Sequence, residues 1–145
     1  MNKNNILKTS FLAKSENESL SRVICASFLS QLDPTIEELT DVKTAVCEAV
    51  TNSIVHAYDG VSDGIIYMDC YINDDTFKVE IKDYGKGIED IKQAMEPMYT
   101  SSPEKERSGM GFTVMETFMD SVNVDSVVGV GTKVTMTKKF VSKVF

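Results

Sequence analysis

Hydrophobic and polar residues alternate most regularly between residues 77 and 82. Apolar side chains fill every second position and charged side chains fill the positions between them: Phe77, Val79 and Ile81 alternate with Lys78, Glu80 and Lys82. A period of two sends the two sets to opposite faces of an extended chain. The pattern therefore predicts a strand with one buried face and one face in water.

Four further segments are rich in β-branched and other apolar residues and are predicted to be strands: 6–13, 65–72, 122–128 and 132–140. The first of them is expected at an edge of the sheet. Asn73-Asp74-Asp75 predicts a hairpin turn before the alternating strand, and Gly129-Val130-Gly131 joins the last two strands. Tight turns between consecutive strands indicate antiparallel pairing.

Two long segments repeat apolar residues at spacings of three and four, the period of a helix buried along one face. Ser15 is expected to begin the first helix, with Glu18 completing a capping box. Asp33 and Pro34 are expected to begin the second, which should end near Tyr58. The predicted buried positions are Leu20, Val23, Ile24 and Phe28 in the first helix, and Ile36, Leu39, Val42 and Val46 in the second.

A short helix is expected within residues 88–94, and another follows the glycine-containing segment 108–111. The predicted order is then β-α-α-β-β-α-β-β. This order favours an α/β two-layer sandwich, in which a mostly antiparallel mixed sheet carries the helices on one face. No repeat, linker or composition change divides the sequence, so residues 1–145 are expected to form a single domain.

Composition narrows the function. The chain has 145 residues, 15 basic and 22 acidic side chains, and a net charge of −7. This balance argues against a nucleic-acid or anionic-membrane surface, which needs clustered lysine and arginine. No segment approaches the roughly 18 apolar residues of a membrane span, and the start lacks the apolar core of a signal peptide. A cytoplasmic location is expected. Cys25, Cys47 and Cys70 are scattered and lack the spacing of a zinc site.

Glu48, Asn52 and His56 follow one another at intervals of four in the second predicted helix. Each interval turns only about 40° around a helix axis, so the three side chains share one face. Burying such groups without partners costs about 1–3 kcal/mol each. A purely structural helix would tend to avoid them, although solvation or bonding to neighbouring loops is an alternative. For His56, capping of the helix end and contact with a ligand both stay open.

Three glycine-containing segments follow this helix: Asp83-x-Gly85-x-Gly87 at a strand end, Ser108-Gly109-Met110-Gly111 before a helix, and Gly129-x-Gly131-Thr132 in the last hairpin. Each alone is explained by a turn, a cap or a hairpin. Between the first two, residues 95–107 show no periodicity and contain two prolines. A structureless segment of this length in a compact domain is typical of a functional loop.

Together, and in this order behind Glu48 and Asn52, the segments resemble the nucleotide-binding boxes of the GHKL ATPase/kinase superfamily, which includes gyrase, Hsp90, histidine kinases and MutL. The resemblance spans nearly the whole chain. Residues 15–19, 48–52 and 103–112 narrow it to the sporulation anti-sigma factor kinases of endospore-forming bacteria. It implies ATP or ADP with Mg²⁺ as cofactors. The length, two prolines and missing apolar stripe of residues 95–107 predict that this segment is a lid, which the terminal phosphate orders.

The resemblance also implies residue roles. Glu48 is the expected general base for a serine hydroxyl, and Arg107 the expected contact to the terminal phosphate. Asn52 is expected to offer an oxygen to Mg²⁺, and Asp83 to accept a hydrogen bond from the adenine amine. Gly85 and Gly87 are expected to let the backbone approach a purine without a Cβ clash. The other expected nucleotide contacts are Thr100, Ser108, Gly109, Met110, Gly111 and Thr132. Arg22 in the first helix is a candidate for partner binding, with an ordinary solvated arginine as the alternative.

The resemblance implies that the protein sequesters a sporulation sigma factor in an ATP-dependent way and phosphorylates a serine of an anti-anti-sigma partner. It also implies a homodimer. The alternative is a nucleotide-gated sigma-factor-binding module without kinase activity, against which the presence of both Glu48 and Asn52 argues. A histidine kinase fragment ranks last. It would need helices carrying a phospho-accepting histidine, and the one histidine here lies in the nucleotide motif.

Overall fold

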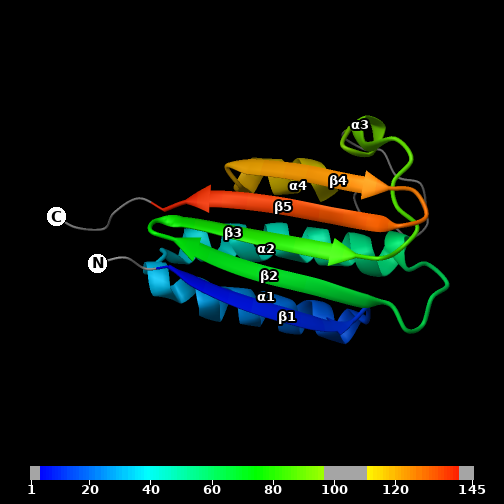
Figure 1. Ribbon diagram of the computed structural model, residues 1–145. Helices are drawn as coiled ribbons and strands as arrows, with labels where there is room; N and C mark the ends of the chain where they lie inside the picture. Colours follow the sequence, from blue (N-terminus) through cyan, green and yellow to red (C-terminus); the bar gives the residue numbers. More distant parts are fainter. Residues whose placement is uncertain (1–3, 97–110, 141–145) are drawn as a thin grey trace.

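The computed structural model describes residues 4–96 and 111–140, and its centre is a five-stranded sheet with the order β1-β2-β3-β5-β4 (Figure 1). The strands are β1 (Asn5–Leu12), β2 (Ile65–Asn73), β3 (Thr76–Asp83), β4 (Ser121–Val127) and β5 (Gly131–Lys139). All four pairings between these described strands are antiparallel, without the parallel pair that a mixed sheet would contain. The predicted strands, and the edge position of the first, are confirmed.

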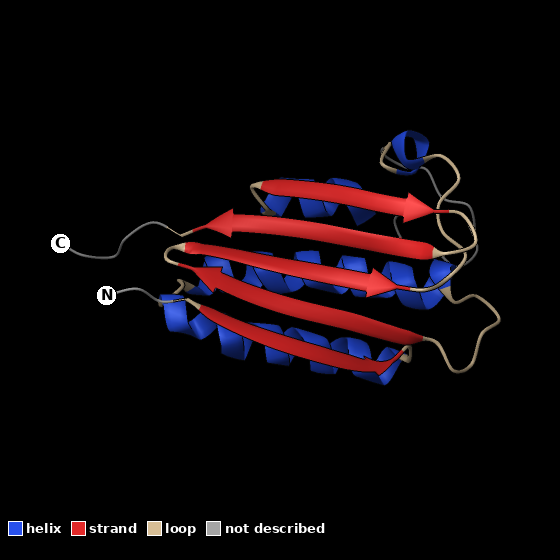
Figure 2. Cartoon of the chain, in the orientation of Figure 1, coloured by secondary structure: helices blue, strands red, loops and turns tan. Residues whose placement is uncertain are grey.

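Three helices cover one face of the sheet, as Figure 2 shows: α1 (Ser15–Leu29), α2 (Ile36–Asn52) and α4 (Gly111–Phe118). A 3-10 turn (Ser30–Leu32) follows α1, and a π-helical turn (Ser53–Ala57) continues α2. The short helix α3 (Ile91–Ala94) stands apart, beyond the end of β4. The predicted two-layer α/β sandwich is confirmed.

Helix α2 is held by the core that it shares with the central strands. Its fully buried residues recur at spacings of three and four, and the predicted alternation buries every second residue of β3: Val42, Ala45, Val46, Ala49 and Val50 meet Phe77, Val79 and Ile81. Burying a large apolar side chain contributes about 1.5–3 kcal/mol. These contacts fix the axis of α2, and with it the direction in which the residues at its end point.

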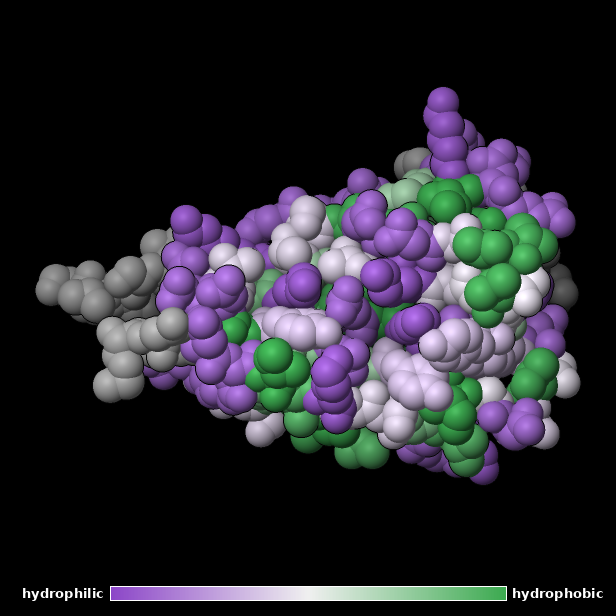
Figure 3. Space-filling model, viewed as in Figure 1, coloured by the Kyte–Doolittle hydropathy of each residue, from purple (hydrophilic) through white to green (hydrophobic). Residues whose placement is uncertain are grey.

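The opposite face of the sheet is open and mostly polar (Figure 3). Lys8 and Lys78 both lie over the Tyr71 ring, and Lys82 lies over Tyr84. Hydrophobic side chains gather at the end of this face near the β4–β5 turn, where Val127 and its neighbours are exposed. No helix within the described ranges 4–96 and 111–140 is long and apolar enough to cross a membrane.

The start of α1 differs from the prediction. The cap position belongs to Lys14, whose backbone is extended and whose side chain makes no cap bond, so Ser15 already lies inside the helix. The Ser15 hydroxyl donates to the neighbouring Glu16, and the Glu18 carboxylate accepts from Arg22 Nε at 2.7 Å. The predicted capping box is therefore wrong, because Glu18 serves an ion pair one turn further along the helix.

The predicted buried stripe of α1 is confirmed at Phe28 and Ile24 but differs at two other positions. Leu20 and Val23 are 48% and 62% exposed, while Ser21 and Cys25 are fully buried. The Ser21 hydroxyl donates to the Glu18 carbonyl at 2.6 Å, so this polar side chain is satisfied within its own helix and can enter the core. Hydrophobicity alone could not detect this exchange.

Helix α2 begins two residues later than predicted. Thr35 is its cap: the Thr35 hydroxyl accepts from the Glu38 amide at 3.1 Å, and the Glu38 carboxylate accepts from the Thr35 amide at 2.8 Å. Asp33 has a left-handed backbone (φ 50°) and ends the 3-10 turn instead. Because the helix starts later, Ile36 falls in its first turn and is 86% exposed rather than buried.

Thr35→Ala should therefore destabilise the protein, whereas Ser15→Ala should not. Loss of a side-chain cap costs about 0.5–2 kcal/mol, and the bond from the Glu38 amide depends on the Thr35 hydroxyl. Ser15 is exposed and bonds only its neighbour, so its replacement should stay within about 0.5 kcal/mol. Urea unfolding of the two variants measures the difference. Equal losses would contradict this account of the helix starts.

Candidate functional site

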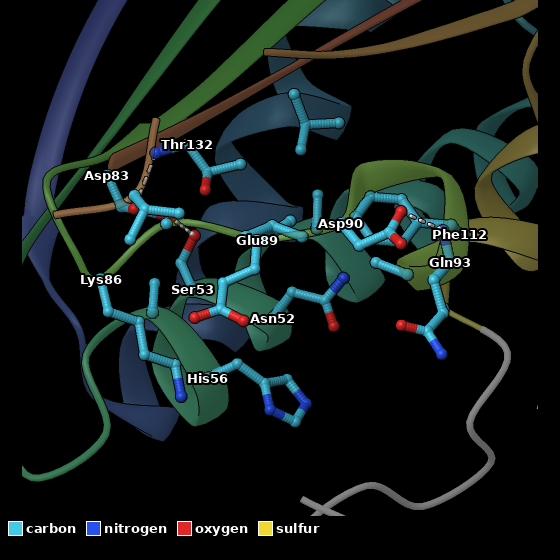
Figure 4. Close-up of a pocket in the computed structure, with 18 residues that line it drawn as sticks. Asn52, Ser53, His56, Asp83, Lys86, Glu89, Asp90, Gln93, Phe112 and Thr132 are labelled. Atoms are coloured by element: carbon cyan, nitrogen blue, oxygen red, sulfur yellow. Dashed lines mark hydrogen bonds between the residues drawn. The ribbon is translucent and has the colours of Figure 1, made fainter. Parts of the chain in front are cut away.

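A cavity of ≈ 390 Å³ lies between the end of α2, the end of β3, the segment that leads to α3, and the start of α4. Figure 4 shows Asp83, Ser53 and Thr132 together at one end, Asn52 and His56 along the helix, and Gln93 and Phe112 at the other end. The remaining lining residues are Ala49, Ala57, Lys86, Gly87, Ile88, Glu89, Asp90, Ala94, Gly111, Val128 and Val134. This volume lies within the usual range for small-molecule sites, roughly 300–1,000 Å³.

Asp83 is the buried charged group of the cavity, with only 3% of its surface exposed. Its carboxylate accepts hydrogen bonds from the Ser53 hydroxyl at 2.8 Å, the Gly85 amide at 3.0 Å and the Thr132 amide at 3.2 Å. Three donors from three separate segments orient one acceptor. The carboxylate therefore marks a fixed point at which a ligand with an N–H group can bind.

Burial raises the pKa of the Asp83 carboxyl above its ordinary value of 3.8. Desolvation disfavours the charged form, and the three hydrogen bonds from Gly85, Ser53 and Thr132 oppose this effect without cancelling it. The unliganded site thus keeps a carboxylate that lacks part of its usual solvation. A further donor supplied by a ligand would restore some of that solvation.

The π-helical turn joins α2 to the end of β3. Within it, the Ala57 carbonyl accepts the Lys86 amide at 3.1 Å. Tyr58 follows, and its hydroxyl donates to the Ile65 carbonyl at 2.6 Å while accepting from the Tyr84 amide at 2.7 Å. The π turn and Tyr58 are thereby tied to the residues that directly follow Asp83, and Tyr58 is tied to the start of β2 as well. A π turn inside a helix is rare and often lies at a functional site.

Close backbone approach explains two of the glycines. Gly87 has a φ of +79°, and a Cβ atom there would lie 2.5 Å from the Val127 carbonyl oxygen. A Cβ at Gly85 would collide with the Ala57 carbonyl. Both positions therefore require glycine for the packing of protein segments on each other. The sequence had suggested a different reason, close approach to a purine.

Gly111 brings α4 against the Glu48 and Asn52 side chains. A Cβ atom at this position would lie 3.3 Å from Glu48 Oε2 and 3.5 Å from Asn52 Oδ1. The space that the missing side chain leaves is bordered by one carboxylate and one carboxamide. The predicted common face of Glu48 and Asn52 is thus turned toward the start of α4.

The structure brings together part of the predicted site. The cavity wall contains Asn52, Asp83, Gly87, Gly111 and Thr132. Glu48 and Gly85 lie next to it without lining it, and Arg22 is elsewhere, on α1, paired with Glu18. Thr100, Arg107, Ser108, Gly109 and Met110, with most of the predicted lid, lie outside the described residues.

Several residues at the site were not predicted. Ser53 holds Asp83, and Tyr58 ties the surrounding backbone. Ser126 contacts Ile88 and Thr132, and Lys86 is the one lysine or arginine among the described wall residues. Of these residues, only Ser53 could have been found from the sequence, because it directly follows Asn52 in the predicted helix. The other contacts arise from tertiary packing.

Comparison with known proteins identifies the family of the chain. Residues 11–138 match the family model described as a histidine kinase-like ATPase domain, and the chain belongs to that family. Within it, the chain is an anti-sigma F factor family member. It is 58% identical to the anti-sigma F factor of Clostridium beijerinckii, covering 94% of this chain and 95% of that protein. It is 54% identical to the one of Caldanaerobacter subterraneus subsp. tengcongensis, covering 95% and 96%.

A solved structure also shares the fold. The crystal structure of the RsbU and RsbW domains of a Mycobacterium tuberculosis protein matches 93% of this chain with a TM-score of 0.67. The match spans 32% of that longer chain, at 17% sequence identity. At this identity the likeness shows the fold alone.

Asp83→Asn should change how stability depends on pH. The folded-state pKa of Asp83 is raised, so its contribution to the free energy of unfolding is complete below pH 3.8 and is lost as the pH rises through the folded pKa. The amide of the variant does not titrate. The stability of the wild type relative to the variant should therefore fall over this window. Urea unfolding between about pH 4 and about pH 7 tests this; parallel curves would contradict it.

Proposed function

We propose that the chain binds ATP or ADP in this cavity and acts as an anti-sigma factor and protein serine kinase. It sequesters a sporulation sigma factor when ATP is bound, and it phosphorylates a serine of an anti-anti-sigma protein. The observation that carries the proposal is the cavity itself, with a buried, oriented carboxylate at one end and the Glu48–Asn52 pair beside it. The family membership supports it.

The base of the nucleotide is assigned to the Asp83 end. An ionised carboxylate only accepts hydrogen bonds, so it suits the exocyclic amine of adenine. Thr132 lies beside it and Gly87 lines the adjacent wall. Binding there adds a donor to a carboxylate whose burial is only partly compensated, which favours a ligand with an amine.

The phosphates need positive charge that the described wall does not supply. Its charged side chains are Asp83, Glu89, Asp90 and Lys86, three carboxylates against one ammonium. We assign the missing charge to Mg²⁺ and to Arg107, with Thr100, Ser108, Gly109 and Met110 as further contacts and residues 95–107 as the lid. All except the first two lid residues lie outside the described ranges.

The residues present fit a magnesium ion held mainly by phosphates. Asn52 offers a neutral oxygen on the wall, and the space left by Gly111 adjoins it. The described residues contain no cluster of three or more His, Cys, Asp or Glu that could bind a metal on its own. Mg²⁺ usually takes few protein ligands and neutralises phosphate charge when bound. Asn52 is the ligand that this chain would contribute.

Glu48 is the proposed general base. It precedes Asn52 by one helical turn and borders the same space beside Gly111, so it would reach a hydroxyl that enters there. Its task would be to take the proton of the incoming serine, and Arg107 would contact the terminal phosphate. Arg22 on α1, which forms an ion pair with Glu18, is proposed to bind a protein partner. The active form is proposed to be a homodimer.

The experiment that tests the function mixes the protein with radiolabelled ATP, Mg²⁺ and an anti-anti-sigma protein. Label on a serine of the partner, with none retained on this chain, is the expected result. Nucleotide-dependent binding of the sigma factor without any transfer would instead indicate a binding module without kinase activity. Label retained on a histidine of this chain would indicate histidine kinase chemistry.

Glu48→Gln and Asn52→Ala should separate chemistry from binding. Glu48→Gln keeps the shape and removes the proton acceptor, so transfer should fall by about 10²- to 10⁴-fold while ATP affinity and sigma-factor binding survive. Asn52→Ala removes a metal ligand, so nucleotide binding and everything that depends on it should weaken together. Calorimetry and the labelling assay measure both. If Glu48→Gln loses nucleotide binding as badly as Asn52→Ala, Glu48 is not the base.

A further inference from the structure

Ser126 connects two segments of the cavity wall without lining the cavity itself. It lies near the end of β4, opposite Thr132 of β5. Its hydroxyl oxygen accepts the Ile88 amide at 2.8 Å and lies 3.1 Å from the Gly131 carbonyl and 2.8 Å from Thr132 Oγ1. One side chain thus bonds both the segment after Gly87 and the residue beside Asp83.

The number of protons decides how these bonds are shared. Ser126 has one hydroxyl proton, which it can donate to Gly131 or to Thr132, not to both. If it donates to Gly131, the Thr132 hydroxyl can donate to Ser126, and together with the Ile88 amide three bonds form. If it donates to Thr132, only two form. The first arrangement makes one more hydrogen bond among these residues, and it is the one in which Ser126 donates to the Gly131 carbonyl.

The favoured arrangement determines what the cavity offers to a ligand. The Thr132 hydroxyl donates its proton to Ser126, so the Thr132 oxygen offers only acceptor lone pairs to the cavity. Asp83, whose Oδ1 accepts the Thr132 amide, presents a second acceptor next to it. The base end of the cavity therefore shows two acceptors and no hydroxyl donor from Thr132.

We propose that Ser126 is a positioning residue for base selectivity, which keeps the Thr132 hydroxyl turned away from the ligand so that the site accepts an amine and rejects an oxo group. The proposal rests on the proposed nucleotide-binding function. Adenine carries an amine at position 6 and an acceptor nitrogen at position 1, whereas hypoxanthine carries an oxygen at position 6 and an N–H at position 1. With Ser126 in place, that oxygen faces acceptors only.

Calorimetric affinities for ADP and inosine diphosphate test this inference. In Ser126→Ala the Thr132 hydroxyl is released and can donate to the oxo group. The preference for ADP over inosine diphosphate should therefore fall by about 2- to 10-fold, the worth of one hydrogen bond. Ser126→Thr keeps a hydroxyl and should restore the preference. A merely structural loosening near Ile88 would lower both affinities together and leave their ratio unchanged.

The other end of the same hairpin supplies a matched control. Ser121 and Thr137 form a second hydroxyl pair between β4 and β5, and neither residue lines the cavity. Ser121→Ala should keep the wild-type ratio. Thr132→Val gives an independent route, because removing its hydroxyl should lower the preference for ADP, and adding Ser126→Ala should then change nothing further.

The outcomes separate this inference from the proposed function. If the wild type binds neither nucleotide, both are overturned. If the wild type binds ADP and the ratio is the same in Ser126→Ala, only the role of Ser126 is overturned. Should Ser126→Ala fail to fold, an unchanged ratio in Thr132→Val would overturn it equally.

Discussion

The hydrogen bond from Ser53 to Asp83 is the contact on which the site depends. It joins the π turn that continues α2 to the end of the central strand β3, and both residues line the cavity. The contact is possible because the helix continues as a π turn, and because Tyr58 and the Ala57 carbonyl hold the two ends in register. The π turn and the position of the Asp83 carboxylate therefore depend on each other.

This arrangement has an energetic cost that the core offsets. A buried carboxylate with a raised pKa is unfavourable in the unliganded protein. The apolar face of α2 and the alternating face of β3, which bury Val42, Val46, Val79 and their neighbours, keep the two elements in place despite it. In the proposed nucleotide complex, a donor from the ligand would give the carboxylate a bond that burial denies it.

The sequence predicted those elements whose signal is local. Alternation in residues 77–82 and the turn at Asp74 defined the central strands, and Glu48 and Asn52 share a face because a helix imposes it. The sequence-based prediction was wrong or silent where tertiary contacts determine which residues are buried or bonded. Ser21 is buried in place of Leu20 because its hydroxyl bonds its own helix. Tyr58 and Ser126 act through partners 26 and 38 residues away, and no spacing along the chain indicates such contacts.

The glycines show how one residue type can be predicted for a partly different reason. Gly87 and Gly85 were expected to admit a purine, yet their missing side chains make room for the carbonyls of Val127 and Ala57. Among the glycines that the structure describes, Gly111 is the one that leaves space beside the Glu48 and Asn52 side chains. The first two glycines build the wall by letting backbone segments touch, and the third keeps open the place where chemistry is proposed. A glycine motif thus reports close approach, and only the structure identifies what approaches.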